Sequence, residues 1–272
     1  MNKKKPVNSS ELVLVISDTH CGSDVGLLPP EVILDDGHKI GYGKNKWQKW
    51  LWESFESTLK VMLEKIGSSP FTLVLNGDLI EGMHHRSDEV VAAKIMEHLA
   101  IARASLGIIV ESAAQVYVVR GTECHTRDTE TVFARDFGLE KAHDFIQFEV
   151  NGVLIDARHH MPCTSRLHLE ATALGIVAAN NRSNAVRAGH KPARIFLRGH
   201  RHIAGTYSDG ECLVACTGAF QGLTRHGKKV VTDSIPRPSM LLLDFRGLPK
   251  GNLPSVLHPV LNPPQELVAH CC

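Results

Sequence analysis

The 272-residue chain contains no long apolar run. Its continuous hydrophobic stretches, such as residues 12–16, are far shorter than the roughly 20 residues that a membrane span needs. No long apolar region follows the basic start at residues 1–8, so we expect no secretory signal and predict a cytosolic protein without membrane partners. Internal repeats and low-complexity segments are also absent. With 43% hydrophobic residues, the chain is expected to bury one large core.

The cysteines show no pairing pattern. There are seven, an odd number, and their spacing matches neither a zinc ribbon nor a regular disulfide framework. We therefore expect reduced thiols. Only two residues separate Cys163 from Arg166, whereas the loop of the cysteine phosphatases needs five, so a catalytic cysteine is not expected.

Charge of one sign is also lacking, since the formal net charge is +1. Residues 158–202 are an exception, with eight Lys or Arg, six His and the single acid Glu170. Such a segment attracts anions if its charges converge on a cleft. A solvated basic surface is the alternative interpretation.

Hydrophobic periodicity predicts helices and strands that alternate through the first half of the chain. The expected helices are 47–66, capped by Asn45 and ended by Gly67, and 89–114, 130–137 and 165–188. The expected strands are 12–16, 71–75, 116–119, 145–150, 153–157, 194–197, 213–216 and 240–245. This order indicates an α/β fold with parallel strands, in either a mixed sheet or two packed sheets with helices outside.

The domain organisation follows from composition. Residues 1–10 form a basic N-terminal tail, residues 11–247 one domain, and residues 248–272 a Pro-rich tail. Residues 22–44 are expected to form a long loop. The prolines after Gly247 are expected to prevent regular structure.

Five of the apolar runs end in residues that can bind metal ions. These residues are Asp18 and His20, Asp78, the segment Gly121 to His125, His159 and His160, and His200 and His202. Ligands in open α/β sheets collect at the carboxyl ends of the strands, where every one of these residues is predicted to lie. Carboxylate and imidazole groups suit borderline divalent ions. Six or more ligands are enough for two ions, with Asp78 bridging them and a shared hydroxide as nucleophile.

The order Asp18-x-His20, Gly77-Asp78, Gly121 to His125, His159-His160 and Gly199-His200-x-His202 resembles the calcineurin-like metallophosphoesterase superfamily, across about residues 12 to 220. The resemblance implies a metallo-dependent phosphatase fold, a two-layer mixed β-sandwich flanked by helices. It also implies a dinuclear metal centre that hydrolyses phosphomonoesters or phosphodiesters. The third motif departs from the family's Gly-Asn-His, because the chain reads Gly-Thr-Glu-Cys-His, a variant that resembles phage-type members.

The resemblance assigns Asp18, His20 and His202 to a first metal and Asp78 to a bridging position. It assigns His200 and one of His159 or His160 to a second metal, and we favour His160. Adjacent residues on extended backbone point in opposite directions, so the other histidine is expected to contact substrate or a ligand.

The altered third motif gives two further expectations. Glu123 would replace the amide ligand of the family, and His125 would be the catalytic histidine that assists the leaving group. His84 and Arg166 are candidate substrate contacts. Two Mn²⁺ ions are the expected cofactors, with iron, nickel, cobalt or zinc as alternatives.

The sequence therefore predicts a metal-dependent phosphoesterase acting on an anionic phosphoester. Nucleic acid and small nucleotides or phosphoesters are equal alternatives as substrate, because no separate DNA-binding module is visible. The competing hypothesis is a non-catalytic binding scaffold that keeps the fold. The sequence leaves the oligomeric state open.

Overall fold

The computed structural model describes residues 10–83, 89–123, 128–161, 170–225, 228 and 236–268. The strands are β1 Leu12–Ile16, β2 Val32–Ile33, β3 Lys39–Ile40, β4 Thr72–Asn76, β5 Gln115–Val119, β6 Ile146–Val150, β7 Val153–Ala157, β8 Ile195–Arg198, β9 Gly205–Ser208, β10 Leu213–Cys216, β11 Leu241–Asp244 and β12 Ser255–Leu257. The helices are α1 Lys46–Ile66, α2 Ile95–Ser112, α4 Thr129–Asp136, α5 Glu170–Arg187 and α7 Gln265–Val268.

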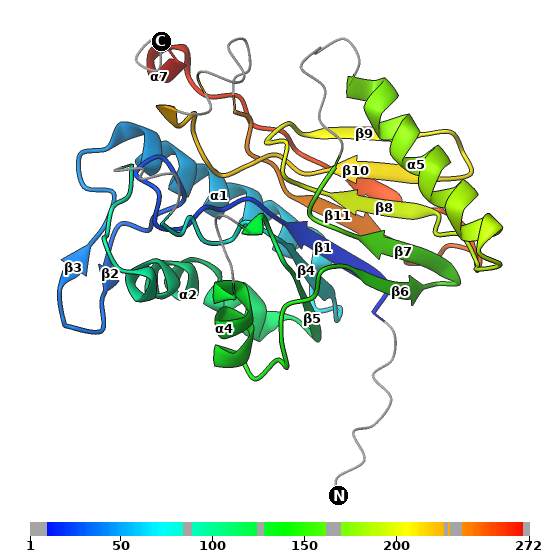
Figure 1. Ribbon diagram of the computed structural model, residues 1–272, viewed down its shortest axis with the longest axis horizontal. Coiled ribbons are helices and arrows are strands. Elements are labelled where there is room, and N and C mark those ends of the chain that lie inside the picture. The colour runs from blue at the N-terminus through cyan, green and yellow to red at the C-terminus, as the bar shows by residue number, and fades with distance from the viewer. Residues whose placement is uncertain are drawn as a thin grey trace, which may run out of the picture.

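Most of the strands belong to two five-stranded mixed sheets (Figure 1). The first has the order β12-β11-β1-β4-β5, and its strands β1, β4 and β5 are parallel. The second has the order β6-β7-β8-β10-β9, and its strands β7, β8 and β10 are parallel. Of the two arrangements that the sequence left open, the structure has two packed sheets, and β2 and β3 form a separate two-stranded sheet. The predicted α/β sandwich flanked by helices is confirmed.

The side chains of β1 show how the layers are stacked, because successive residues of a strand face opposite ways. Leu12 and Leu14 belong to a core with residues of α1, α2 and α4. Val13 and Val15 belong to a second core shared with β7, β8 and β10. A third core joins the outer face of the second sheet to α5. The order of layers is therefore helices, sheet, sheet, helix.

Helix α1 follows the predicted pattern at both ends. The side chain of Asn45 accepts hydrogen bonds from the backbone N–H groups of Trp47 and Gln48, and Gly67 ends the helix at a positive φ of 64°. An N-cap of this kind stabilises a helix by about 1 kcal/mol. The predicted bounds of this helix are confirmed to within one residue.

Helix α2 is shorter than the predicted 89–114. It begins at Ile95, where the backbone N–H of Lys94 donates to the carboxylate of Glu97 at 3.0 Å. Just before it, Val91 donates from its backbone to Gly22, and Ser23 forms a bridge with Val90. These extended pairings with the segment after β1 compete with helix formation, which explains the later start.

The expectation that prolines exclude regular structure after Gly247 is wrong. Pro254 and Pro259 flank β12, which pairs with β11 at the edge of the first sheet. Proline disrupts a central strand but is tolerated next to an edge strand, so three of the four residues between these prolines can still pair.

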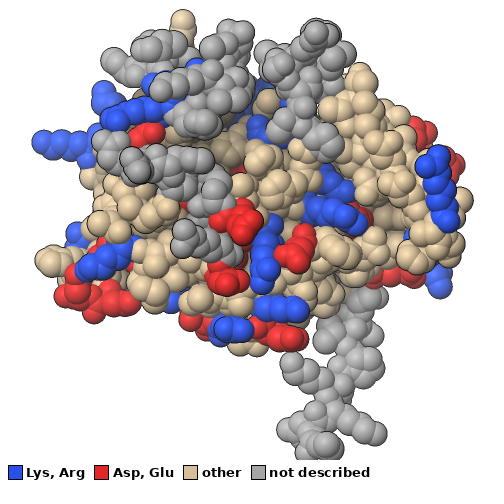
Figure 2. Space-filling model, in the orientation of Figure 1, with Lys and Arg blue, Asp and Glu red and all other residues tan. Residues whose placement is uncertain are grey.

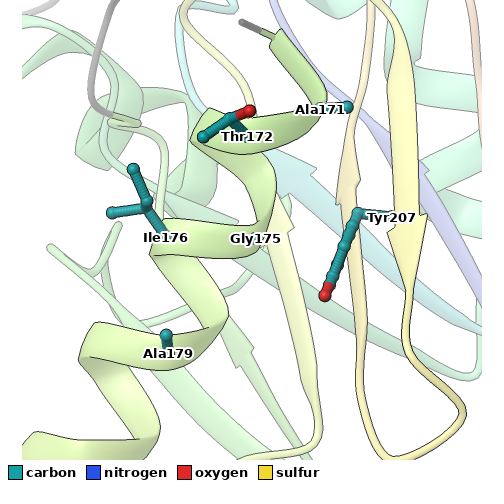
Figure 3. A pocket seen from close by; sticks show the side chains of 6 residues that line it. All are labelled: Ala171, Thr172, Gly175, Ile176, Ala179 and Tyr207. Atoms are coloured by element: carbon teal, nitrogen blue, oxygen red, sulfur yellow. The ribbon is translucent and has the colours of Figure 1, made fainter.

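A shallow apolar pocket lies between α5 and β9 (Figure 3). It is lined by Ala171, Thr172, Gly175, Ile176, Ala179 and Tyr207. Small residues of α5 face the ring of Tyr207, and a Cβ at Gly175 would lie 3.5 Å from that ring. None of the predicted metal ligands lines this pocket. Within the described residues, no helix has both the length and the apolar character needed to cross a bilayer.

Candidate metal centre

The predicted ligands follow directly after β1, β4, β7 and β8, and backbone hydrogen bonds hold the loops together in pairs. His20 donates from its backbone to the carbonyl of Asp78 at 3.0 Å, within the first sheet. Gly199 donates to the carbonyl of His159 at 2.9 Å, within the second sheet. The backbone N–H of His200 donates to Oδ1 of Asp18 at 3.0 Å and joins the two pairs. The site therefore lies where the strand ends of both sheets meet.

Asp18, His20 and His202 form the first cluster of candidate ligands. Nε2 of His202 lies 3.1 Å from Nε2 of His20 and 3.5 Å from Oδ1 of Asp18. Asp18 and His20 are buried, whereas the side chain of His202 is 29% exposed. One side of this cluster is therefore open to solvent.

Asp78, His159 and His200 form the second cluster. Oδ2 of Asp78 lies 2.9 Å from Nε2 of His159. The hydroxyl of Thr122 lies between Asp78 and His200, 3.0 Å from Oδ2 of Asp78 and 3.1 Å from Nδ1 of His200. Oδ2 of Asp78 is also 4.0 Å from Nε2 of His20, so Asp78 joins the two clusters.

The spacing of these atoms suits divalent cations. Metal bonds of about 2.1 Å place neighbouring ligand atoms roughly 3.0 to 3.4 Å apart in octahedral or tetrahedral geometry. The cluster atoms and the Thr122 hydroxyl include neighbouring pairs that are 2.9 to 3.5 Å apart. A set of carboxylates and imidazoles matches the preference of borderline ions such as Mn²⁺ or Zn²⁺. The structure thus holds two adjacent candidate metal positions.

Five of the predicted ligands have left-handed backbone conformations. The φ angles are 52° at Asp18, 43° at His20, 49° at Asp78, 70° at His200 and 56° at His202. Residues other than glycine rarely adopt this region, and such strain is concentrated at functional sites. Among the described residues, the only other non-glycine example is the hairpin residue Asn151. The backbone is therefore strained at the residues that the motifs select.

Two glycines allow the loops to approach closely. A Cβ at Gly121 would overlap the backbone and carboxylate of Asp78. A Cβ at Gly199 would lie 2.7 Å from Oδ2 of Asp18. Both glycines are therefore required by contact with a ligand and not by their own backbone angles.

The electrostatics of the site favour positive charge. Burial raises the pKa of Asp18 to about 6, and the neighbouring charge of Asp78 adds to this shift. Burial alone would lower the pKa of His159, but the charges of Asp78 and Asp18 outweigh it and raise that pKa to about 10. A protonated imidazole beside two carboxylates satisfies the same charge requirement that a metal cation would.

The structure places His159, and not the favoured His160, in the second cluster. His159 is 1% exposed, and both of its ring nitrogens are hydrogen-bonded. Nε2 contacts Oδ2 of Asp78, and Nδ1 lies 2.7 Å from the carbonyl oxygen of Asn76. His160 is exposed, although its ring centroid lies 4.8 Å from that of His200. The alternation along the chain turns His159 inward, so His160 lies at the rim of the site.

Glu123 does not join either cluster, contrary to expectation. It is exposed, whereas Thr122 points inward and contacts Asp78 through both its backbone N–H and its hydroxyl. Thr122 therefore occupies the position beside the second cluster that was predicted for Glu123. The predicted catalytic His125 and the predicted substrate contacts His84 and Arg166 lie outside the described residues.

Sequence reasoning missed two buried carboxylates. Oε2 of Glu81 lies 2.7 Å from Nδ1 of His20, and the side-chain amide of Gln221 donates to the same oxygen at 2.8 Å. Glu130 accepts backbone hydrogen bonds from Leu79 and Gly121. Glu81 could have been found, because a ligating histidine usually donates its second nitrogen to a carboxylate. Glu130 carries no comparable signal in the sequence.

The basic residues of segment 158–202 are largely engaged with acids or carbonyl groups. Lys191 pairs with Glu149 at 2.7 Å, and Arg198 pairs with buried Asp156 at 2.9 Å. In the view of Figure 2, the described basic and acidic side chains are interspersed. The described part of this segment therefore gives no sign of a continuous basic track.

The chain is similar in fold to several solved structures. Vps29 from Cryptosporidium parvum shares 12% identity with a TM-score of 0.46, covering 94% of this chain and 100% of that one. An archaeal phosphodiesterase shares 13% identity with a TM-score of 0.42, covering 92% and 99%. The phosphoesterase Yfce from E. coli shares 12% identity with a TM-score of 0.42, covering 92% and 100%. No family model and no curated protein matches the chain.

Proposed function

We propose that the protein is a dinuclear metal-dependent phosphoester hydrolase and a member of the calcineurin-like metallophosphoesterase superfamily. The observation that carries the proposal is the pair of adjacent clusters, Asp18, His20 and His202 beside Asp78, His159 and His200. The carboxylate of Asp78 reaches both, at 2.9 Å from His159 and 4.0 Å from His20. A shared carboxylate between two cation positions is the arrangement that two-metal hydrolysis of phosphoesters requires.

Each of the two ion positions would have its own set of ligands. Asp18, His20 and His202 would hold one ion, and Asp78, His159 and His200 the other, with the Thr122 hydroxyl as a further neutral donor of the second position. Two bound divalent ions would supply the positive charge that binds phosphate oxygens and makes water acidic enough to attack. Glu81 keeps the ring of His20 turned toward the site through its bond to Nδ1.

Mn²⁺ is our proposed ion, and a small phosphoester is our proposed substrate. Imidazole and carboxylate donors suit Mn²⁺, while iron, nickel, cobalt and zinc fit the same donor types. The acid partners of Lys191 and Arg198 favour a small substrate over nucleic acid, because a nucleic acid is held chiefly by unpaired cationic side chains along its backbone.

The test is hydrolysis by purified, metal-stripped protein after addition of a single divalent ion. Aryl phosphate monoesters, aryl phosphate diesters, nucleotides and single-stranded DNA should be compared with each of Mn²⁺, Fe²⁺, Co²⁺, Ni²⁺ and Zn²⁺. We expect turnover that depends on the added ion and is greatest with Mn²⁺. Folded protein that binds two ions but hydrolyses none of these substrates would contradict the proposal.

A binding scaffold is the second candidate, because the amide ligand of the family's third motif is replaced here by Thr122. Exchange of His125 for alanine separates the two functions. In an enzyme, His125→Ala should lower turnover by about 10² to 10⁴ while both ions stay bound, since a general acid contributes about that much. A scaffold would show no turnover to lose, with the same metal content in both proteins.

A further inference from the structure

We infer that Glu130, which belongs to neither ligand cluster, is a positioning residue that sets the second metal position by joining two of the loops that line it. The inference rests on the proposed two-metal function. Glu130 lies at the start of α4, and its side chain is fully buried behind the site.

The two oxygens of Glu130 bind two different loops. Oε1 accepts the backbone N–H of Leu79 at 3.0 Å, and Oε2 accepts the backbone N–H of Gly121 at 2.6 Å. Leu79 directly follows Asp78, and Gly121 directly precedes Thr122. One carboxylate therefore fixes the distance between the loop that carries the shared ligand and the loop that carries the hydroxyl donor.

The loops touch each other with no side chain between them. The backbone of Gly121 packs directly against Asp78, and the N–H of Thr122 donates to Oδ1 of Asp78 at 2.6 Å. That contact leaves Oδ2 of Asp78 facing His159 and the Thr122 hydroxyl. A small shift of either loop would therefore change the spacing of the second cluster directly. Asp18 and His20 of the first cluster are joined to the Asp78 loop by backbone hydrogen bonds of their own, to the carbonyls of Gly77 and Asp78, which do not involve Glu130.

Glu130 is a buried carboxylate, and its chemistry fits the role of joining two loops. Among the charged side chains of the described residues, no Lys or Arg forms an ion pair with Glu130, and burying a carboxylate without a cationic partner is costly. An ionised carboxyl group is, however, the one side-chain group of this size that accepts two hydrogen bonds from opposite sides without donating any. Neighbouring cations would offset the remaining cost of its burial. The two backbone N–H groups that need an acceptor thus explain why position 130 is an acid.

The test is the Glu130→Gln variant, which keeps the shape of the side chain but presents an amide N–H₂ to one of the two loop N–H groups. Binding of Mn²⁺ to the metal-free protein is followed by calorimetry, and the manganese pair by its spin-coupled electron paramagnetic resonance signal. We expect the second binding step to weaken by about 10- to 100-fold, as for other residues that orient ligands, while the first step changes much less. The spin-coupled signal at two equivalents of Mn²⁺ should fall in parallel.

Thr131→Val is the matched control. Thr131 is the next residue of α4, is also buried, and its hydroxyl accepts from the backbone of Ala142 at 3.4 Å, away from both loops. It should leave both binding steps and the spin-coupled signal unchanged. Glu130→Asp, which is one methylene too short to span the loops, should behave as Glu130→Gln does and serves if that variant does not fold.

The outcomes separate this inference from the proposed function. A wild-type protein that binds fewer than two ions would overturn the function itself. Wild-type binding of two ions, together with unchanged or equally weakened steps in folded Glu130 variants, would overturn the role of Glu130 alone. Equal weakening would mean that Glu130 acts only on general stability.

Discussion

The two ligand clusters differ in how much negative charge belongs to each alone. The first has its own carboxylate, Asp18, and its His20 is oriented by a second carboxylate, Glu81. The second has only the shared Asp78, and its His159 is oriented by a neutral backbone carbonyl. Affinity for divalent ions rises with the number of charged ligands. We therefore expect the first position to bind its ion more tightly and to fill first.

The largest effect should come from breaking both positions at once. Asp78→Asn removes the one carboxylate that reaches both clusters, so we expect loss of the second bound ion, a weaker first site and turnover at the background level. Metal content and hydrolysis of an aryl phosphate check this. Asp144→Asn, at an exposed acid paired with Arg120, is the control and should match the wild type. Full activity in Asp78→Asn would refute the shared-ligand arrangement.

Replacing one histidine of the adjacent pair sharpens the comparison. His159→Ala should weaken the second Mn²⁺ binding step by more than about 100-fold, since loss of a ligand costs more than loss of a residue that orients one. His160→Ala should leave both binding steps within about threefold of the wild type, because that ring lies at the rim. Calorimetric titration of the two variants side by side distinguishes them. The reverse result would restore His160 as the ligand.

A smaller change should affect the first position alone. Glu81→Gln keeps a side chain of the same size beside His20 but removes the charge that supports its ring, so the first binding step should weaken by about 10- to 100-fold. The second step should stay as it is. Isothermal titration with Mn²⁺ measures both steps, and weakening of the second step only would contradict the assignment of Glu81 to the first.

A graded effect, about tenfold for a change of one unit, is expected from pH. The pKa of Asp18, raised by burial to about 6 from an ordinary value of 3.8, means that its neutral form prevails in the metal-free protein below about pH 6. A cation must displace that proton, so first-step affinity should fall by about tenfold per pH unit below 6. The pKa of the Asp18 carboxyl is higher in the folded protein than in the unfolded chain. Its contribution to folding stability is therefore present below about pH 4 and is lost as the pH rises through 6. Titrations and unfolding of metal-free protein between about pH 4 and 7 check both directions.

The parts of the molecule that could be predicted are those fixed by local pattern. Helix α1 has its periodicity, its Asn45 cap and its Gly67 end within the segment itself. Asp18, Asp78 and His200 follow apolar runs, and the carboxyl ends of parallel strands gather at one edge. Elements and ligands of this kind can be predicted without knowing which distant segments they contact.

The parts that could not be predicted depend on contacts between distant segments. Alternation shows that one of His159 and His160 faces inward, but only the register of β7 beside β8 decides which. Thr122 faces the site because its loop packs against Asp78, 44 residues away in the sequence. Glu130 lies 51 residues beyond one of its partners. No local pattern records such pairings.

The short strand β12 bears on how this protein can be shortened. Its three residues cover the outer side of β11 and so end the first sheet. A version cut after Gly247, where the predicted Pro-rich tail begins, would lack β12 and so uncover the outer N–H and C=O groups of β11. An uncovered strand edge recruits strands from other molecules. Trimming the proline-rich end would therefore expose a strand edge that favours aggregation.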